Sequence, residues 1–236
     1  MTILDGKKTS EDLKQEIAEE VKQLKAKGKR VPHLAAVLVG NDGASLTYVG
    51  SKVKACEQVG FESTLVKLPA NISEEALLQE IEKLNANSEI DGYIVQLPLP
   101  KHINEQEILL AIDPTKDVDG FHPINVGKLV IGEAKLIPCT PLGILEMIKS
   151  TGDEIDGKLA LVIGRSNIVG KPISTLLLQN NATVITAHSK TKNLDSLLEQ
   201  ADIIVSCVGS AHFLTGDEKV KETVTIIDVG NNYKDD

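Results

Sequence analysis

The chain has 236 residues, enough for one large domain or two smaller ones, and its formal net charge is −9. A net negative charge gives no bulk attraction to phosphate backbones, so nucleic-acid binding is not expected. Hydrophobic residues make up 42% of the chain but aromatic residues only 3%, which predicts an aliphatic core with Val-, Ile- and Leu-rich buried strands. The apolar runs are too short to span a bilayer, so we expect no membrane association.

The cysteines and the N-terminal residues indicate the cellular compartment. Cys56, Cys139 and Cys207 are far apart and odd in number, and neither a CxxC pair nor histidines at ligand spacing accompany them. We therefore expect three reduced thiols and no bound metal. The first twenty residues carry charges throughout and contain no apolar segment of the kind found in signal peptides, which predicts a cytoplasmic protein.

In the first half of the chain, helical stretches alternate with apolar runs of strand length. Helices are predicted near residues 10–27, 44–59, 73–84 and 104–111, and strands near residues 34–39, 63–68 and 92–97. Ser73 is followed by Glu74 and Glu75, which is typical of a helix start. The hydroxyl group can cap the first amides, and the two acids favour the positive end of the helix dipole.

The second half repeats this alternation. Helices are predicted near residues 142–150, from about 170 onward and near 194–200, and strands near 159–163, 183–187, 202–208 and 223–229. Alternating strands and helices with apolar strands indicate an α/β fold with two parallel sheets, each covered by helices. We place the boundary near Pro138-Cys139-Thr140-Pro141, where two prolines interrupt regular structure, so that the domains are residues 1–140 and 141–236.

A strand, a tight turn and a helix follow one another at the start of the second domain. The strand at 159–163 runs into Gly164-Arg165-Ser166, and the helix opens near Gly170. The pattern resembles the dinucleotide-binding fingerprint, with Ser166 at the place of the second glycine and Gly170 one position late. Gly164 permits the turn, and the helix N-terminus offers amides and a positive dipole end to a pyrophosphate. The motif is weak when taken alone, because such a turn can also be purely structural.

The end of the next strand indicates which nucleotide is bound. NAD-specific sites usually place an acid there, which binds the ribose 2′-hydroxyl. In this chain the strand at 183–187 runs into His188-Ser189-Lys190 instead. A 2′-phosphate would meet Ser189 and Arg165, so the sequence favours NADP over NAD. The alternative is that His188 and its neighbours form an ordinary polar loop.

Tyr48 and Lys52 are four residues apart in a predicted helix, so both side chains project from one helix face. A phenol beside an amine can hydrogen-bond to a substrate and transfer a proton. A Tyr-x-x-x-Lys pair is common, however, and usually belongs to a solvated face. Short-chain dehydrogenases use such a pair, but there it follows the nucleotide-binding turn. Here it precedes that turn by more than a hundred residues, which argues against that family.

Two further polar residues stand where ligands gather. Gln96 lies at the end of the strand at 92–97, before a Pro-x-Pro turn, and the carboxyl ends of parallel strands are the usual place for a ligand. Asp119 lies in the polar segment 116–120, where it could accept hydrogen bonds from a pterin-like N–H edge. The alternatives are that Gln96 only satisfies loop amides and that Asp119 only forms an Asx-turn. A calcium loop is excluded, because its later ligands are missing.

Taken together and in order, these motifs resemble those of the bifunctional methylene-tetrahydrofolate dehydrogenase/methenyl-tetrahydrofolate cyclohydrolase family. The resemblance runs through essentially the whole chain, from Leu4-Asp5-Gly6 to Asp228-Val229-Gly230. The segments that carry it are Tyr48-x-x-x-Lys52, Val95-Gln96-Leu97-Pro98, Lys116-Asp117-Val118-Asp119-Gly120, Pro138-Cys139-Thr140-Pro141 and Gly164-Arg165-Ser166.

The resemblance implies an activity and an architecture. Two domains are expected around a cleft, with folate against the N-terminal catalytic domain and NADP on a C-terminal Rossmann-like domain. The expected reactions are the NADP-dependent oxidation of 5,10-methylene-tetrahydrofolate and the hydrolysis of the methenyl product to 10-formyl-tetrahydrofolate. These reactions belong to one-carbon metabolism and purine biosynthesis. The expected partners are tetrahydrofolate derivatives, NADP and a second copy of the chain in a homodimer.

The resemblance also implies roles for individual residues. Lys52 is expected to be the acid/base of the hydrolysis, with Gln96 tuning it, Tyr48 packing on the folate rings and Asp119 holding the pterin. The expected substrate-binding residues are Tyr48, Gln96, Leu97, Pro98 and Asp119. The expected NADP-binding residues are Thr140, Gly164, Arg165, Ser166, His188 and Ser189.

The sequence departs from this family at one end. Members continue past the position of Asp236 with a further strand, a glycine-rich loop at the cofactor site and a helix, so we expect a truncated NADP-binding domain. Two other readings stay open on the sequence alone. A different two-domain NADP dehydrogenase, such as a shikimate dehydrogenase, would act on shikimate. A truncated member without turnover would bind folate or NADP without forming NADPH.

Overall fold

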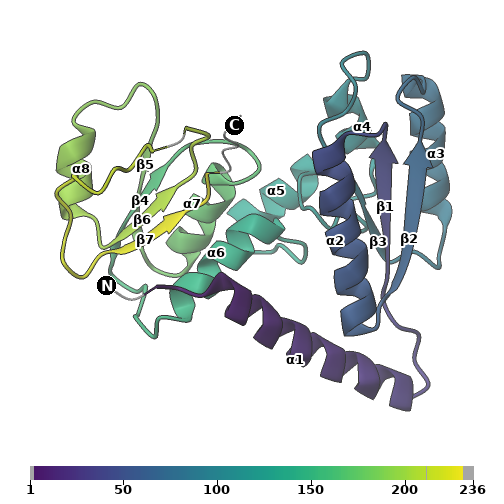
Figure 1. Ribbon diagram of the computed structural model, residues 1–236, viewed down its shortest axis with the longest axis horizontal. Coiled ribbons are helices and arrows are strands. Elements are labelled where there is room, and N and C mark those ends of the chain that lie inside the picture. Colours follow the sequence, from purple (N-terminus) through teal and green to yellow (C-terminus); the bar gives the residue numbers. More distant parts are fainter. Residues whose placement is uncertain (1–2, 211, 231–236) are drawn as a thin grey trace. The chain divides into compact units, whose positions relative to one another are not determined.

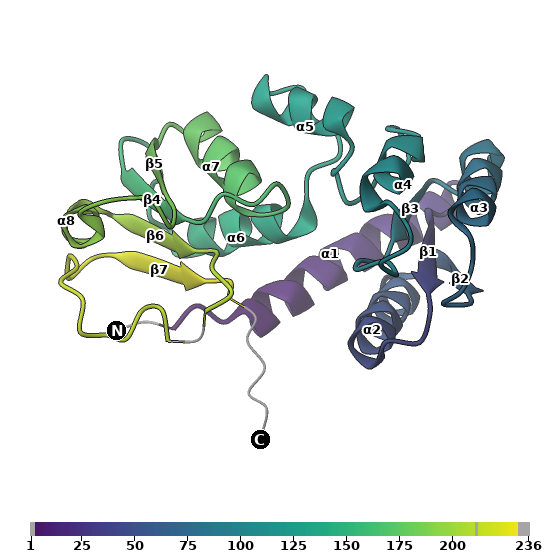
Figure 2. The same ribbon diagram turned by 90° about the horizontal axis from the view of Figure 1, so that it is seen from above.

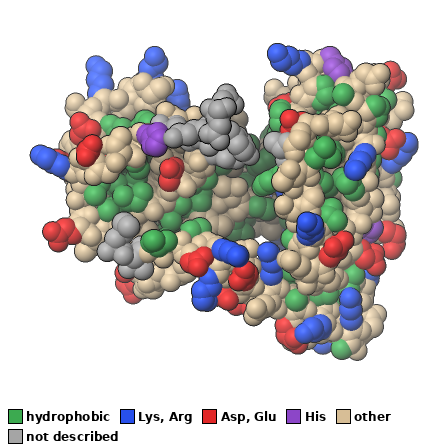
Figure 3. Space-filling view, viewed as in Figure 1, with side chains coloured by type: hydrophobic (Ala, Val, Ile, Leu, Met, Phe, Trp, Pro, Cys, Tyr) green, Lys and Arg blue, Asp and Glu red, His purple; other side chains and the backbone are tan. Residues whose placement is uncertain are grey.

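The computed structural model describes residues 3–210 and 212–230 (Figure 1). They form two compact units. The first unit is Asp5–Asn125, and the second comprises the described residues of Val126–Asp236 together with those of Met1–Leu4. On the face shown in Figure 3, positive and negative side chains are interspersed in both units. Among the described residues, no helix combines the length and the apolar character needed to cross a membrane.

The first unit is an α/β layer whose helices have side-chain caps. Asp5, Asp42, Ser73 and Asn104 each accept a hydrogen bond from an amide in the first turn of the helix that follows, which satisfies one of its otherwise free donors. The elements are α1 Gly6–Ala26, β1 His33–Val39, α2 Gly43–Val59, β2 Glu62–Leu68, α3 Glu74–Ala86, β3 Gly92–Val95 and α4 Glu105–Ala111.

The three strands form a parallel sheet in the order β2-β1-β3. Figure 2 shows α2 on one side of the sheet and α3 with α4 on the other. Alternate side chains of the strands serve the two faces. Leu38 and Ile94 pack with Val49 of α2, whereas Tyr93 packs in the opposite core with Leu77 of α3. Because both faces are covered, β3 and the buried part of β1 are apolar, whereas the edge strand β2 alternates exposed and half-buried residues.

The second unit is a four-stranded parallel sheet in the order β5-β4-β6-β7. Its elements are α6 Cys139–Lys149, β4 Leu159–Ile163, α7 Gly170–Gln179, β5 Thr183–Ala187, α8 Leu194–Gln200, β6 Ile203–Ser206 and β7 Thr225–Asp228. One core cluster joins α6 and α7 to the sheet through Val162 and Val205, and a second joins α8 through Leu161 and Ile204. The predicted α/β class with parallel sheets is confirmed.

Both sheets are doubly wound. In the first, β1 is followed by β2 on one side and by β3 on the other; in the second, β4 is followed by β5 on one side and by β6 on the other. The order in which strands are added to each sheet therefore reverses, between β1 and β3 in the first sheet and between β4 and β6 in the second. Ligands of open α/β sheets bind at the carboxyl ends of the strands at such switch points. Ligand sites are therefore expected at the segments that follow Val39, Val95, Ile163 and Ser206.

The structure departs from the predicted elements at three places. Strand β3 ends before Gln96, so Gln96 belongs to the following loop. The helix α5, Pro123–Val130, was not predicted, and the border between the two units falls inside it. Near residue 140, α6 begins at Cys139, three residues before the predicted helix start at 142, so that the two prolines lie at a helix start. Pro138 is its N-cap and Pro141 lies in its first turn, where a proline removes no intrahelical hydrogen bond.

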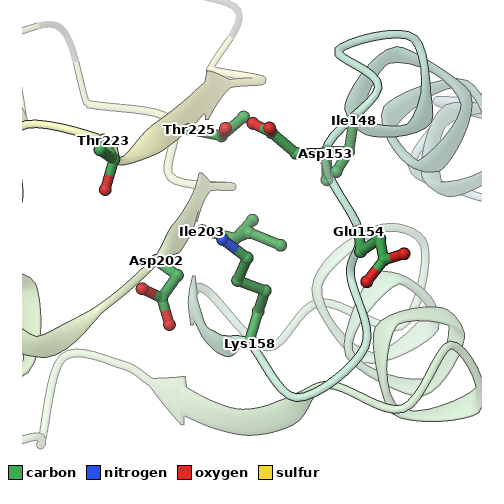
Figure 4. A pocket seen from close by; sticks show the side chains of 8 residues that line it. All are labelled: Ile148, Asp153, Glu154, Lys158, Asp202, Ile203, Thr223 and Thr225. Atoms are coloured by element: carbon green, nitrogen blue, oxygen red, sulfur yellow. The ribbon is translucent and has the colours of Figure 1, made fainter.

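Asp202 joins the amino ends of the strands of the second sheet. Its carboxylate accepts hydrogen bonds from the Leu159 amide at 2.9 Å and from Lys221 Nζ at 2.7 Å. These bonds, that of Lys221 first, lower the pKa of Asp202. The residue borders a small pocket lined by Ile148, Asp153, Glu154, Lys158, Asp202, Ile203, Thr223 and Thr225 (Figure 4). Among the described residues, no group of three His, Cys, Asp or Glu side chains could hold a metal ion.

The Asp202 interactions predict a pH dependence of stability. Because the pKa of Asp202 is lower in the folded chain, its contribution is complete above the unfolded pKa of about 3.9 and is lost as the pH falls through the folded value. Asp202→Asn should reduce stability by about 1 kcal/mol at neutral pH and by progressively less below pH ~4. Thermal unfolding between neutral and acidic pH measures this. Asp153→Asn, which lines the same pocket, is the control; a difference that does not change with pH would contradict the prediction.

Two glycines of the second unit should respond oppositely to alanine. A Cβ on Gly170 would lie 2.4 Å from the Gly164 carbonyl oxygen, a backbone atom that cannot rotate away. Gly170→Ala should therefore destabilise the unit by about 1–3 kcal/mol. A Cβ on Gly143, inside α6, would meet nothing within 4 Å, so Gly143→Ala should stabilise it by up to ~1 kcal/mol. Circular dichroism melts of the two variants test this pair, and equal shifts would refute the packing argument.

Candidate active site

Gln96 carries a buried acceptor at the switch point of the first sheet. Its backbone N–H donates to the Val37 carbonyl at 2.9 Å. Strand alternation places its side chain on the same face as Ile94, the face that α2 covers. Gln96 Nε2 donates to the Leu97 carbonyl at 2.7 Å, which requires the nitrogen at that position. Gln96 Oε1 is buried and has no hydrogen-bond partner among the described residues. Such an orphan acceptor costs roughly 1–3 kcal/mol, so it marks a place for an incoming donor.

Tyr48 and Lys52 lie together on α2, the helix that covers this face. Lys52 Nζ lies 4.6 Å from the centroid of the Tyr48 ring, a cation–π distance. The Tyr48 side chain is 56% exposed, which leaves an aromatic surface for a flat ligand, while Lys52 is half-buried. The predicted pairing of a phenol and an amine on one helix face is thus present. An exposed aromatic beside a cation is a surface suited to a planar, charged heterocycle.

The segment that carries Asp119 packs against β3. The Tyr93 amide donates to the Lys116 carbonyl at 2.9 Å, and a Cβ on Gly92 would lie only 2.3 Å from Val118 Cγ1. Val118 joins the core cluster on the α2 face. The segment therefore reaches the same side of the sheet as Gln96, and only glycine at position 92 allows that approach.

Asp119 lies within electrostatic reach of Lys52. Desolvation raises the pKa of the half-buried Asp119 carboxyl; the charge of Lys52 opposes this shift and the charge of Asp117 adds to it. The first unit therefore brings together an amine, an exposed aromatic ring and a carboxylate, and it carries an unpartnered amide oxygen at the end of β3. These groups can bind a planar heterocycle with an N–H edge and move a proton beside it.

Leu97 and Pro98 form the loop after Gln96 and are joined by a cis peptide bond. Leu97 is half-buried and Pro98 is exposed. The loop is held by Glu105, which accepts a hydrogen bond from the Leu99 amide at 3.0 Å. These two residues thus form an apolar rim next to the Gln96 amide.

Sequence reasoning missed Asp117 and Asn125, both of which are buried. Asp117 accepts hydrogen bonds from the His122 amide and from Asn125 Nδ2, each at 2.8 Å. Only the spacing of two acids in Asp117-Val118-Asp119 could have signalled that one faces inward. Asn125 gave no signal, because its helix α5 was not predicted.

The turn after β4 brings backbone atoms unusually close. Gly164 has φ +128°, and a Cβ there would lie 2.9 Å from the Cys207 carbonyl oxygen. Gly170 at the start of α7 meets the backbone of Gly164 on the other side. Both glycines therefore have a packing reason, and the helix N-terminus is held tightly against the end of the strand.

Ser166 explains why the second glycine of the fingerprint is dispensable. Its hydroxyl accepts from the Val169 and Gly170 amides, each at 3.2 Å, and its carbonyl accepts from the Lys171 amide at 3.0 Å. The amides at the start of α7, which the fingerprint would offer to a pyrophosphate, are therefore already bonded to Ser166. Within residues 3–210 and 212–230, the amides of 165–168 have no hydrogen-bond partner, and their residues are exposed. This run of donors fits a diphosphate.

The end of β5 lies beside the turn that follows β4. The Gly164 amide donates to the Ala187 carbonyl at 2.8 Å, which places the turn next to His188-Ser189-Lys190. The His188 amide donates to Thr191 Oγ1 and the Lys190 amide to His188 Nδ1, so this segment is a hydrogen-bonded turn with Ser189 exposed. Arg165 is also exposed. The carboxyl edge of the sheet thus presents the Ser189 hydroxyl and the Arg165 cation, and the turn after β5 contains no carboxylate. These are the groups that a 2′-phosphate requires.

Thr140 is exposed on the first turn of α6. Ile148, near the other end of α6, lines the pocket at the amino ends of the strands. The first turn therefore lies toward the carboxyl ends, the edge that carries Gly164. Among the described residues, no hydrogen bond joins Thr140 to the turn at Gly164.

The chain resembles known proteins along its whole length. Residues 4–119 match the family described as tetrahydrofolate dehydrogenase/cyclohydrolase, catalytic domain, and residues 138–236 match its NAD(P)-binding domain. The bifunctional protein FolD of Flavobacterium johnsoniae is 57% identical over 98% of this chain and 79% of its own length. That of Oceanobacillus iheyensis is 54% identical over 100% of this chain and 82% of its own length.

Solved structures show the same likeness. The bifunctional methylenetetrahydrofolate dehydrogenase/cyclohydrolase FolD of Campylobacter jejuni has a TM-score of 0.95 at 47% identity, covering 100% of this chain and 83% of its own. The enzyme of Trypanosoma brucei, solved with NADP and an inhibitor, has a TM-score of 0.93 at 36% identity, covering 100% and 80%. The chain belongs to the tetrahydrofolate dehydrogenase/cyclohydrolase family.

Proposed function

We propose that the chain oxidises 5,10-methylene-tetrahydrofolate with NADP and hydrolyses the resulting 5,10-methenyl-tetrahydrofolate to 10-formyl-tetrahydrofolate. Membership of the family and identities above 50% to bifunctional relatives support both activities. The observation that carries the proposal is the Lys52 amine 4.6 Å from the Tyr48 ring on α2, together with the orphan oxygen of Gln96 at the switch point of the first sheet. The reactions belong to one-carbon metabolism.

The oxidation needs binding and orientation and no acid from the protein. Removal of hydride from the methylene carbon leaves a cation delocalised over two nitrogens, so the task of the chain is to position the folate. Tyr48 offers a ring face to the heterocycle, Asp119 accepts from its N–H edge, and Leu97 with Pro98 supplies an apolar rim. When bound, NADP supplies the acceptor for the hydride.

The second unit has a site that suits NADP. The amides of residues 165–168 would hold the diphosphate, and Gly164 keeps the turn close to the sheet. Arg165 and Ser189 would bind the 2′-phosphate, with His188 shaping the turn, and Thr140 would lie at the same edge of the sheet. The NADP in the trypanosomal relative supports this preference.

The hydrolysis needs proton transfer. Water adds to the methenyl carbon and loses one proton, which leaves a hydroxyl on that carbon. The hydroxyl then loses the second proton as the formyl C=O forms and the bond to N5 breaks, and N5 takes up a proton, so that one proton is released overall. Lys52 is the acid/base in this scheme. Its amine lies 4.6 Å from the Tyr48 ring, which is the proposed surface for the folate, and so lies beside the bound substrate. Gln96 Oε1 would accept a hydrogen bond from the amine and orient it.

The remaining assignments follow from the same proposal. Residues 1–140 would form the folate-binding catalytic domain, and residues 141–236 the NADP-binding domain. A homodimer is expected from the family resemblance. A cytoplasmic location is supported by the three free cysteines, Cys56, Cys139 and Cys207.

Absorbance of reduced nicotinamide tests the oxidation directly. The chain is mixed with 5,10-methylene-tetrahydrofolate and either NADP or NAD. We expect NADPH formation and a preference for NADP, because the turn after β5 offers no acid to a ribose 2′-hydroxyl and two donors to a 2′-phosphate. Turnover with NAD alone would overturn the roles of Arg165 and Ser189. Turnover of shikimate, or of neither substrate, would overturn the proposed function.

Lys52→Gln should separate the two activities. Loss of the amine removes the proton-transfer group, so hydrolysis of 5,10-methenyl-tetrahydrofolate should fall at least ~100-fold while NADP-dependent oxidation remains measurable. The decay of methenyl absorbance, corrected for the uncatalysed rate, measures the first activity. Lys54→Gln, two residues further along α2 and exposed, is the matched control and should keep both activities. Full hydrolysis by Lys52→Gln would refute the assignment.

A further inference from the structure

The two acids of the loop after β3 have opposite surroundings. The Asp117 side chain is almost fully buried, with 2% of the residue exposed, and its Oδ2 accepts from the His122 amide and from Asn125 Nδ2, each at 2.8 Å. No hydrogen bond to the Asp119 carboxylate is found in the described part of the chain. Asp119 is therefore held in place by the backbone that carries it and not by bonds of its own.

Asp117 closes that backbone into a ring. The bond from the His122 amide to its side chain joins the two ends of the segment 117–122, and the Gly120 amide donates to the Asp117 carbonyl at 3.1 Å. Gly120 has φ +67°, a left-handed conformation that turns the chain back. Asp119 lies in the middle of the ring, so its direction depends on the closure.

The ring is anchored on both sides. Tyr93 of β3 forms a parallel bridge with Asp117, which sets the height of the loop along the sheet. Asn125 Nδ2 donates to the Asp117 carboxylate and also to the Pro114 carbonyl, each at 2.8 Å. It therefore connects the start of α5 to the two ends of the segment 114–117. A buried charge with two donors is strongly attached, because removing either partner leaves a desolvated group unpaired.

We propose that Asp117 is a positioning residue for substrate binding: its buried carboxylate holds the segment 117–122 so that the carboxylate of Asp119 stays free and aimed at the N–H edge of the folate. The inference rests on the proposed function. It gives the two acids distinct tasks, one bonding to the protein and the other to the ligand. Asp117 itself touches no reacting atom.

A double-mutant cycle on the full chain tests this proposal. Asp117→Asn, Asp119→Asn and the double variant are compared by calorimetric titration with tetrahydrofolate and, separately, with NADP. We expect Asp117→Asn to weaken tetrahydrofolate binding about tenfold and to change the Kd for NADP less than about twofold. In the Asp119→Asn background the same change should weaken tetrahydrofolate binding less than about twofold, because Asp117 acts through Asp119.

Turnover supplies a second readout. In the NADP-dependent oxidation, Asp117→Asn should raise the KM for 5,10-methylene-tetrahydrofolate by a larger factor than it lowers kcat. Asp113→Asn is the matched control and should leave both constants unchanged. Asp113 lies four residues before Asp117, and its carboxylate accepts hydrogen bonds from the amide and the hydroxyl of Thr115. Additive losses in the cycle, or equal losses of tetrahydrofolate and NADP affinity, would show a merely structural role and overturn the proposal.

A variant that keeps the charge covers the case in which Asp117→Asn does not fold. Asn125→Ala removes one of the two donors and leaves the Asp117 side chain unchanged, and it should show the same selective loss of tetrahydrofolate affinity to a smaller extent. Unchanged affinity in Asn125→Ala, with Asp117→Asn unfolded, would count against the proposal. Failure of the wild-type chain to turn over either folate would refute the proposed function instead.

Discussion

The parallel pairing of β1 with β3 is the constraint on which the first unit depends. The hydrogen bond from the Gln96 amide to Val37 continues the strand ladder one residue past β3 and so fixes which face its side chain takes. Because β1 leads into the loop before α2, the same pairing brings the helix with Tyr48 and Lys52 over that face. A shift of one residue in the register would turn Gln96 toward the opposite core, away from the face that α2 covers.

The second unit reaches a similar result with backbone contacts. Its switch point lies between β4 and β6, and Gly164 fills the space beside Cys207 where a side chain would not fit. Ser166 then takes up the amides that begin α7, which leaves the amides of the turn itself exposed. The anion site is thus displaced from the helix N-terminus to the turn before it, and the positive end of the helix dipole still lies behind it.

Much of this arrangement could be predicted from the sequence, since strand and helix alternation is a local pattern. The short helix α5 escaped prediction, because none of the usual capping residues precedes Pro123–Val130. In the structure His122 Nδ1 accepts a hydrogen bond from the Ile124 amide at 3.1 Å instead. Lys52 and Gln96 were predictable from spacing and from their place at a strand end. The inward direction of Asp117 was not, because it depends on donors from His122 and Asn125, and long-range hydrogen bonds leave no periodic trace in the sequence.

The two close glycine contacts differ in how evolution can alter them. At Gly92 the nearest obstacle is a side chain, because a Cβ there would lie 2.3 Å from Val118 Cγ1 and 3.2 Å from the Lys116 carbonyl oxygen. With valine at position 118 only glycine fits, whereas a smaller residue at 118 would remove the shorter of these two contacts. At Gly170 the obstacle is the main chain of Gly164, which every residue type shares. No second substitution can relieve that clash. Position 92 should therefore covary with position 118 among homologues, whereas position 170 should stay glycine in every lineage that keeps this turn.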